Sequence, residues 1–407
     1  MNCRHCKASL IETFLDLGFA PPSNAYLTAV DLCKPEKYYP LRIMVCTDCW
    51  LVQTEDYVEA FELFSLDYAY FSSASSSWLH HAKNYAEKLI KMLELNKNNL
   101  VIEVGSNDGY LLKTFLASGV PCLGIEPTAS TAATAEKLGI PVVREFFGEA
   151  LAKRLASERR QADLIVGNNV YAHVPDINDF TMGLKAALKC GGTITLEFPH
   201  LKKLIENNQF DTVYHEHFSY LSLYTVDRIF KAAGLRIWDV EKLPTHGGSI
   251  RIYGCHIEDA RATKKTVETV LFEEAQCGLQ TLAAYRYLQS RVNKVKNDLL
   301  SFLIKQKKTG KRVVAYGAAA KGNTLLNYAG VKSDLIPFIC DAAPAKQGKY
   351  APGSHIPILP PSALSSGFWH FILILPWNIA REIMVENSEL TASGTKFVVA
   401  VPEMRTL

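Results

Sequence analysis

Two stretches of this chain share one order of apolar and polar positions. Residues 99–119, NLVIEVGSNDGYLLKTFLASG, begin with an apolar run, continue through glycines and end with apolar residues at helical spacing. That order predicts a buried strand, a tight turn and an amphipathic helix. Residues 311–330, KRVVAYGAAAKGNTLLNYAG, repeat it. Alternating strands and helices favour an α/β fold with a doubly wound parallel sheet, whose ligand crevice lies at the carboxyl ends of the strands.

The same pattern divides the chain into domains. Apolar residues at helical spacing from about residue 75 predict a linker helix, and EKLPTHGGSIRIYGCH (241–256) predicts a hairpin that completes the central sheet. We expect three domains: a small N-terminal domain at 1–70, a central Rossmann-like domain at 71–257 and a second Rossmann-like domain at 258–407.

Composition and charge narrow the possible partners. The 407 residues are 48% hydrophobic and 21% charged, which is sufficient for two or three domains with cores of their own. The net charge of +3 comes without a long basic run, so we expect no nucleic-acid or membrane partner. The chain begins MNCRHCK, without a secretion-signal pattern, and has no apolar run long enough to span a membrane. We therefore expect a cytoplasmic protein.

Four of the ten cysteines are paired by spacing. Cys3 and Cys6 form one C-x2-C pair, and Cys46 and Cys49 form a second. Two such turns can present four thiolates to one zinc ion, whereas four free or disulfide-linked cysteines are the alternative. A shell of four thiolates leaves no open position on the metal. We therefore expect a structural zinc that organises the N-terminal domain.

The glycine turn at residues 105–109 is typical of a nucleoside site. Glu126 ends the next predicted strand, where an acidic side chain can accept both hydroxyls of a ribose. Asn107 replaces the middle glycine of the dinucleotide pattern, so a pyrophosphate would fit poorly. S-adenosylmethionine carries no phosphate and is the expected cofactor, with Glu103 near its methionine portion and a plain tight turn as the alternative. The candidate residues are Glu103, Gly105, Asn107, Asp108, Gly109, Glu126, Asn168 and Asn169.

These motifs together resemble a family. The cysteine pairs, EVGSNDGYLL, NNVYAHV, YHEHFSY, YGAAAKGNTLLN and DAAPAKQGKYAPGSHIPI are similar, in matching order over nearly the whole chain, to the sugar C-methyltransferases. That family methylates C3 of nucleotide-linked 4-keto-deoxysugars. The resemblance implies a zinc-binding N-terminal domain, a central domain for S-adenosylmethionine and a C-terminal domain that helps to hold a TDP-linked sugar.

The resemblance also assigns catalytic residues. One family tyrosine falls in DYAYFSS, at either Tyr68 or Tyr70, and the sequence does not decide between them. The other catalytic positions that match are His173, Tyr214, Glu216 and His217.

The C-terminal glycine turn offers a second ligand site. Lys321 lies inside the turn at the start of a predicted helix, which suits a diphosphate, whereas a degenerate unit kept for packing is the alternative. The candidate substrate-binding residues are Gly317, Lys321, Gly322, Asp341 and, from the central rim, His200.

Residues 211–220, DTVYHEHFSY, place two histidines around a glutamate. Removal of a C3 proton beside a C4 ketone needs a neutral base and a donor to the developing oxyanion. We predict His217 as the base, with Glu216 as its rival. A metal site and a packed core strand are the alternatives. In an extended segment, Tyr214 and Glu216 would point away from His217, whereas a turn would change which side chains converge.

Other classes of activity compete with this interpretation. A zinc-ribbon RNA methyltransferase would use the cysteine module to grip RNA, but the near-neutral charge disfavours it. A sugar O- or N-methyltransferase and a non-catalytic scaffold are further alternatives. The sequence leaves the sugar, its nucleotide and the oligomeric state open.

Overall fold

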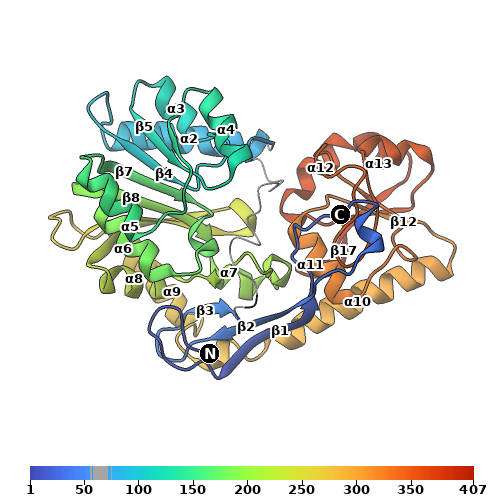
Figure 1. Cartoon of the computed structure of the whole chain (residues 1–407). Coiled ribbons are helices and arrows are strands. Elements are labelled where there is room, and N and C mark those ends of the chain that lie inside the picture. The colour runs from blue at the N-terminus through green and yellow to red at the C-terminus, as the bar shows by residue number, and fades with distance from the viewer. Residues whose placement is uncertain (56, 58–71, 75) are drawn as a thin grey trace.

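The computed structural model describes residues 1–55, 57, 72–74 and 76–407, and it shows an α/β protein built on three sheets (Figure 1). Tyr68 and Tyr70, the alternatives for the N-terminal catalytic tyrosine, lie outside the described residues. Within the described part, no helix combines the length and apolar character needed to cross a membrane. The expected α/β class is confirmed.

The central sheet has seven strands in the order β10-β11-β8-β7-β4-β5-β6. Strands β4 to β8 run parallel, and the β10–β11 hairpin pairs with β8 in antiparallel fashion. The hairpin expected at 241–256 is therefore confirmed. The strands are β4 (Val101–Val104), β5 (Cys122–Ile125), β6 (Val142–Val143), β7 (Ala162–Asn168), β8 (Leu188–Pro199), β10 (Leu235–Leu243) and β11 (Ser249–His256).

Both faces of this sheet are covered, because successive strand side chains point to opposite faces. On β7, Leu164 and Val166 join one core while Ile165 joins the other. The predicted linker helix is confirmed as α2. The helices of this part are α2 (Ser76–Met92), α3 (Leu112–Ala117), α4 (Ala129–Lys137), α5 (Glu149–Ser157), α6 (Ile177–Ala187), α7 (Leu201–Glu206), α8 (Leu223–Ala232) and α9 (Lys265–Gln276).

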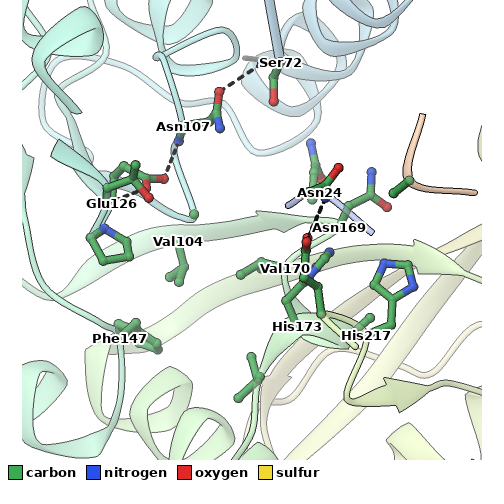
Figure 2. A pocket seen from close by; sticks show the side chains of 18 of the residues that line it. Asn24, Ser72, Val104, Asn107, Glu126, Phe147, Asn169, Val170, His173 and His217 are labelled. Carbon is green, nitrogen blue, oxygen red and sulfur yellow. Dashed lines mark hydrogen bonds between the residues drawn. The ribbon is translucent and has the colours of Figure 1, made fainter. Parts of the chain in front are cut away.

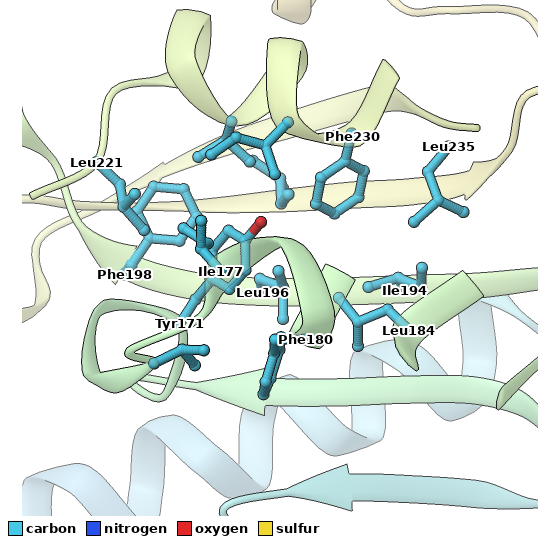
Figure 3. Close-up of a cluster of buried hydrophobic side chains, with 14 of the residues drawn as sticks. Tyr171, Ile177, Phe180, Leu184, Ile194, Leu196, Phe198, Leu221, Phe230 and Leu235 are labelled. Carbon is cyan, nitrogen blue, oxygen red and sulfur yellow. The ribbon is translucent and has the colours of Figure 1, made fainter. Parts of the chain in front are cut away.

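Aromatic side chains fill the core between β8, α6 and α8 (Figure 3). Phe180, Phe198 and Phe230 are each at most 2% exposed. Burial of each such side chain stabilises the fold by about 1.5–3 kcal/mol. This packed core fixes the strand ends from which the ligand-facing loops begin.

The C-terminal sheet has six strands in the order β14-β13-β12-β15-β16-β17. Its strands are β12 (Val313–Tyr316), β13 (Ile339–Cys340), β14 (Ile358–Leu359), β15 (Phe371–Ile374), β16 (Lys396–Val399) and β17 (Arg405–Thr406). Its helices are α10 (Leu288–Lys308), α11 (Ala320–Ala329), α12 (Ala380–Glu386) and α13 (Ser388–Ala392). The strand, turn and helix predicted at 311–330 are confirmed as β12 and α11.

The N-terminal sheet lies against both larger units. Its strands are β1 (Glu12–Ala20), β2 (Tyr39–Val45), β3 (Val52–Thr54) and β9 (Ser219–Tyr220). Strand β9 comes from the chain of the central unit and pairs with β3. On the other side, Phe14 and Ile43 share a core with Leu299 of α10 and Leu326 of α11. The long β1–β2 ribbon runs beneath both larger units (Figure 1).

Candidate active site

A cavity of about 690 Å³ opens at the carboxyl ends of β4, β5 and β7. Its lining comes from all three parts of the chain, including Asn24 from the N-terminal part and Lys321 from α11. Figure 2 shows Glu126 and Phe147 at one end of this cavity and His173 and His217 at the other. One cavity therefore has room for a cofactor and the group that it modifies.

The cofactor end is built on the turn after β4. Gly105 and Asn107 have positive φ values of 69° and 48°. A β-carbon on Gly105 would lie 3.1 Å from Val170 Cγ2, so a larger residue would be strained in conformation and in space. The Asn107 backbone N–H donates to Glu126 Oε2 (2.9 Å), and the Thr128 N–H donates to Oε1 (2.9 Å). These bonds hold the Glu126 carboxylate at the cavity wall.

The side-chain amide of Asn168 indicates that the cofactor end of the cavity binds a polar ligand. Asn168 ends β7, is 8% exposed and lines the cavity. Its side-chain oxygen and nitrogen are buried without a hydrogen-bond partner among the described residues. Buried polar groups are normally paired, so this amide is suited to a polar ligand. With the glycine turn and Glu126, it makes a site that fits S-adenosylmethionine.

The predicted cofactor residues do not all reach the cavity. Gly105, Asn107, Glu126, Asn168 and Asn169 line it. Glu103 is fully buried behind the turn, and its burial, with the charges of Asp108 and Glu126 adding to it, raises its pKa well above the usual value. Asp108 instead accepts a hydrogen bond from the Ser73 N–H (3.1 Å), and Gly109 packs against Ile140.

Sequence reasoning missed the apolar wall of the cofactor end. Phe146 and Phe147 follow the two-residue strand β6 and line the cavity beside Glu126 and Pro127. The apolar pair at 142–143 is too short for a periodic pattern, which is why its loop escaped notice. If residues 142–143 had been recognised as a third parallel strand, the loop with Phe146 and Phe147 would have been predicted at the ligand crevice.

At the other end, residues 214–217 form a turn instead of an extended segment. The His217 N–H donates to the Tyr214 carbonyl (2.9 Å), so Tyr214, Glu216 and His217 all line the cavity. His215 points elsewhere, and its Nε2 lies 3.2 Å from the Pro40 carbonyl. Of the two conformations left open by the sequence, the segment adopts the turn, and Tyr214 and Glu216 therefore line the same cavity as His217.

His217 has the geometry of a neutral base. Its Nδ1 lies 2.9 Å from the Thr212 carbonyl, which can only accept, so Nδ1 carries the proton and Nε2 is left as an acceptor. The His217 ring centroid lies 4.0 Å from that of Tyr214 and 4.6 Å from that of His173. Burial, with a smaller effect from His173, lowers the pKa of His217 well below its usual value. Burial also lowers the pKa of His173 to about 4.

The C-terminal part contributes a partly buried cation. Lys321 Nζ donates to Asn378 Oδ1 (2.6 Å) and lies 4.8 Å from the centre of the Trp377 ring. Burial lowers the pKa of Lys321, and the charge of Asp211 opposes that shift. Asp211 itself accepts a hydrogen bond from Trp377 Nε1 (2.7 Å).

Four other predicted substrate residues do not line this cavity. The Gly317 turn packs against Pro376, and Gly322 packs against Leu375. His200 Nε2 lies 2.6 Å from Glu274 Oε1 in a buried pair. Asp341 accepts from the Ala343 N–H (2.8 Å). Lys346 does line the cavity, and its Nζ donates to the Ala318 carbonyl (2.9 Å).

The four paired cysteines converge at one point of the N-terminal part. The Sγ atoms of Cys3 and Cys49 lie 3.5 Å apart, as do those of Cys6 and Cys46, and all four lie within 4.8 Å of one another. Zinc bound tetrahedrally at about 2.3 Å from each sulfur needs sulfur atoms roughly 3.8 Å apart. The cluster therefore fits one structural zinc.

Models of known families match most of the chain. Three family models match in succession: "Putative zinc binding domain" at residues 3–64, "Methyltransferase domain" at 78–240 and "C-methyltransferase C-terminal domain" at 244–402. The C-methyltransferase NovU of Streptomyces niveus is 32% identical over 406 residues, which cover 100% of this chain and 96% of the relative.

Solved structures resemble part of the chain. Magnesium protoporphyrin IX methyltransferase of Synechocystis PCC 6803, with bound SAH, is 12% identical, with 43% of this chain and 82% of that chain covered and a TM-score of 0.35. The YcgJ protein of Bacillus subtilis is 13% identical, with 44% and 99% covered and a TM-score of 0.35.

Proposed function

Because this chain belongs to the C-methyltransferase family and is an S-adenosylmethionine-dependent enzyme with a zinc-binding domain, we propose that it methylates C3 of a nucleotide-linked 4-keto-deoxysugar. The observation that carries the proposal is His217, a buried neutral imidazole whose acceptor nitrogen is available in the same cavity as the cofactor turn. Methylation at carbon requires a carbon nucleophile, and a C4 ketone makes the C3 proton removable.

Each residue of the site has a role in proton removal or in cofactor binding. His217 Nε2 accepts the C3 proton, and the C–H electron pair moves into an enolate. The Thr212 carbonyl, which accepts from Nδ1–H, stabilises the imidazolium that forms. Tyr214 and His173 flank the ring, and they orient the sugar or donate to the enolate oxygen. S-adenosylmethionine, when bound, supplies an electrophilic methyl group. Glu126 would hold its ribose, and the Asn168 amide would bind one of its polar groups.

Lys321 supports an anionic substrate. Lys321 is partly buried, and removal of an ammonium group from water is costly unless the charge is paired. In the described structure its hydrogen-bond partner is the neutral Asn378, and the Asp211 carboxylate is bonded to Trp377. A diphosphate in the cavity would pair this charge, which favours a sugar that carries a nucleotide.

A substrate panel tests the proposal. The purified protein is incubated with several nucleotide-linked 4-keto-deoxysugars and isotopically labelled S-adenosylmethionine, and each product is analysed by NMR. We expect a new methyl group on C3 of at least one sugar. Label on oxygen or nitrogen, or label only in added RNA, would contradict the proposal.

A further inference from the structure

A short segment of the zinc-binding part reaches the cavity by way of the C-terminal unit. Asn323 Nδ2 of α11 donates to the Ser23 carbonyl (2.8 Å), and the Ser23 and Thr324 hydroxyl oxygens lie 3.2 Å apart. Tyr26 donates its hydroxyl to the Ala318 carbonyl (2.5 Å). Residues 23–26 are therefore fixed along the start of α11.

This segment presents Asn24 to the catalytic turn. Asn24 Nδ2 donates to Glu216 Oε1 (2.8 Å) and to Oε2 (2.9 Å), and both residues line the cavity. Figure 2 shows Asn24 at this cavity. Glu216 is 2% exposed, so solvent does little to orient its carboxylate. Helix α11 also holds the Glu216 loop, because Thr324 Oγ1 donates to the Val213 carbonyl (2.9 Å). One end of α11 thus sets the positions of Asn24 and Glu216 together.

We propose that Asn24 is a positioning residue for the methylation reaction, and that the zinc-binding part completes the active site by orienting Glu216. The inference rests on the proposed function, because Glu216 precedes the base His217 in the same turn and lines the same cavity. One amide nitrogen that donates to both carboxylate oxygens fixes the plane of the Glu216 carboxylate at the cavity wall. A displacement of about 1 Å at such a group can reduce turnover by roughly 100-fold.

The test compares Asn24→Ala with Asn178→Ala in the full-length, zinc-loaded protein. Asn178 is a matched control, because its amide also joins the zinc-binding and central parts but lies outside the cavity. Its Nδ2 lies 2.9 Å from the His5 carbonyl, and its Oδ1 lies 2.8 Å from His5 Nδ1. We expect Asn24→Ala to lower kcat about 10- to 100-fold with KM for S-adenosylmethionine within about twofold. Asn178→Ala should stay within about twofold in both.

A double-mutant cycle separates positioning from a general loss of structure. If Asn24 acts through Glu216, Asn24→Ala should change kcat by less than about twofold in a Glu216→Gln background. Equal losses in both backgrounds, or an equal loss in Asn178→Ala, would overturn the inference. Asn24→Asp keeps the side-chain shape while it removes the donors, so it should lose at least as much activity; full activity in this variant would also overturn it.

The wild-type protein separates this inference from the proposed function. A wild type that methylates the sugar on oxygen or nitrogen would contradict the proposed function. The cycle measured on kcat would still decide the role of Asn24.

Discussion

Replacement of Glu126 by alanine should weaken binding of the cofactor without loss of the fold. The side chain is 6% exposed and accepts one backbone N–H on each oxygen, at 2.9 Å in both cases. Each carboxylate oxygen keeps acceptor capacity for a ribose hydroxyl. Loss of a charge-assisted pair of hydrogen bonds costs roughly 2–4 kcal/mol, which corresponds to a roughly 30- to 1000-fold weaker affinity.

Calorimetric titration with S-adenosylhomocysteine measures this change directly. Glu136→Ala is a matched control, because that carboxylate pairs with Arg144 at the surface and lies outside the cavity. It should bind as the wild type does. The Asn107 and Thr128 N–H groups lose their acceptor in Glu126→Ala, so thermal unfolding is recorded alongside and should still show a single folded species. Unchanged affinity in a folded Glu126→Ala protein would place the ribose elsewhere and refute the reasoning.

The remaining predictions concern the metal and His173. We expect one zinc per chain by elemental analysis, and Cys46→Ser should lower the yield of folded protein more than the turnover of the molecules that fold; a folded variant that retains its zinc would refute the ligand assignment. Burial lowers the pKa of His173 from 6.5 to about 4, so the unfolded chain binds a proton there that the folded protein does not, and stability is lost as the pH falls from 6.5 to 4. This contribution amounts to roughly 3 kcal/mol. Chemical denaturation across this range should show a shallower loss for His173→Asn, and an identical slope would contradict the assignment.

Regular patterns made much of the fold predictable. The strand, turn and helix of residues 99–119 and 311–330 follow from apolar periodicity, and each lies where its pattern places it. The spacing of the cysteine pairs likewise predicted a cluster that the structure shows. These features depend on residues close together in the chain.

Tertiary contacts account for what the sequence did not reveal. Asn24 and Glu216 are 192 residues apart, and no local pattern links them. Tyr214, Glu216 and His217 line one cavity because residues 214–217 form a turn. This turn contains no glycine or proline, the residues that usually predict one. Histidine is a residue type common in binding sites, but His200 pairs with Glu274. Its position at the start of α7 directs its side chain toward α9.

Exchange of the C3 hydrogen tests the central claim most directly. The 4-keto-deoxysugar nucleotide that the wild type accepts is incubated in deuterated water with S-adenosylhomocysteine in the cofactor site, which isolates proton removal from methyl transfer. We expect the wild type to exchange the C3 hydrogen and His217→Asn to abolish exchange while sugar binding stays nearly intact. Exchange at the wild-type rate in His217→Asn, with loss of exchange only in Glu216→Gln or His173→Asn, would contradict the account. The base would then be the residue whose replacement abolishes exchange.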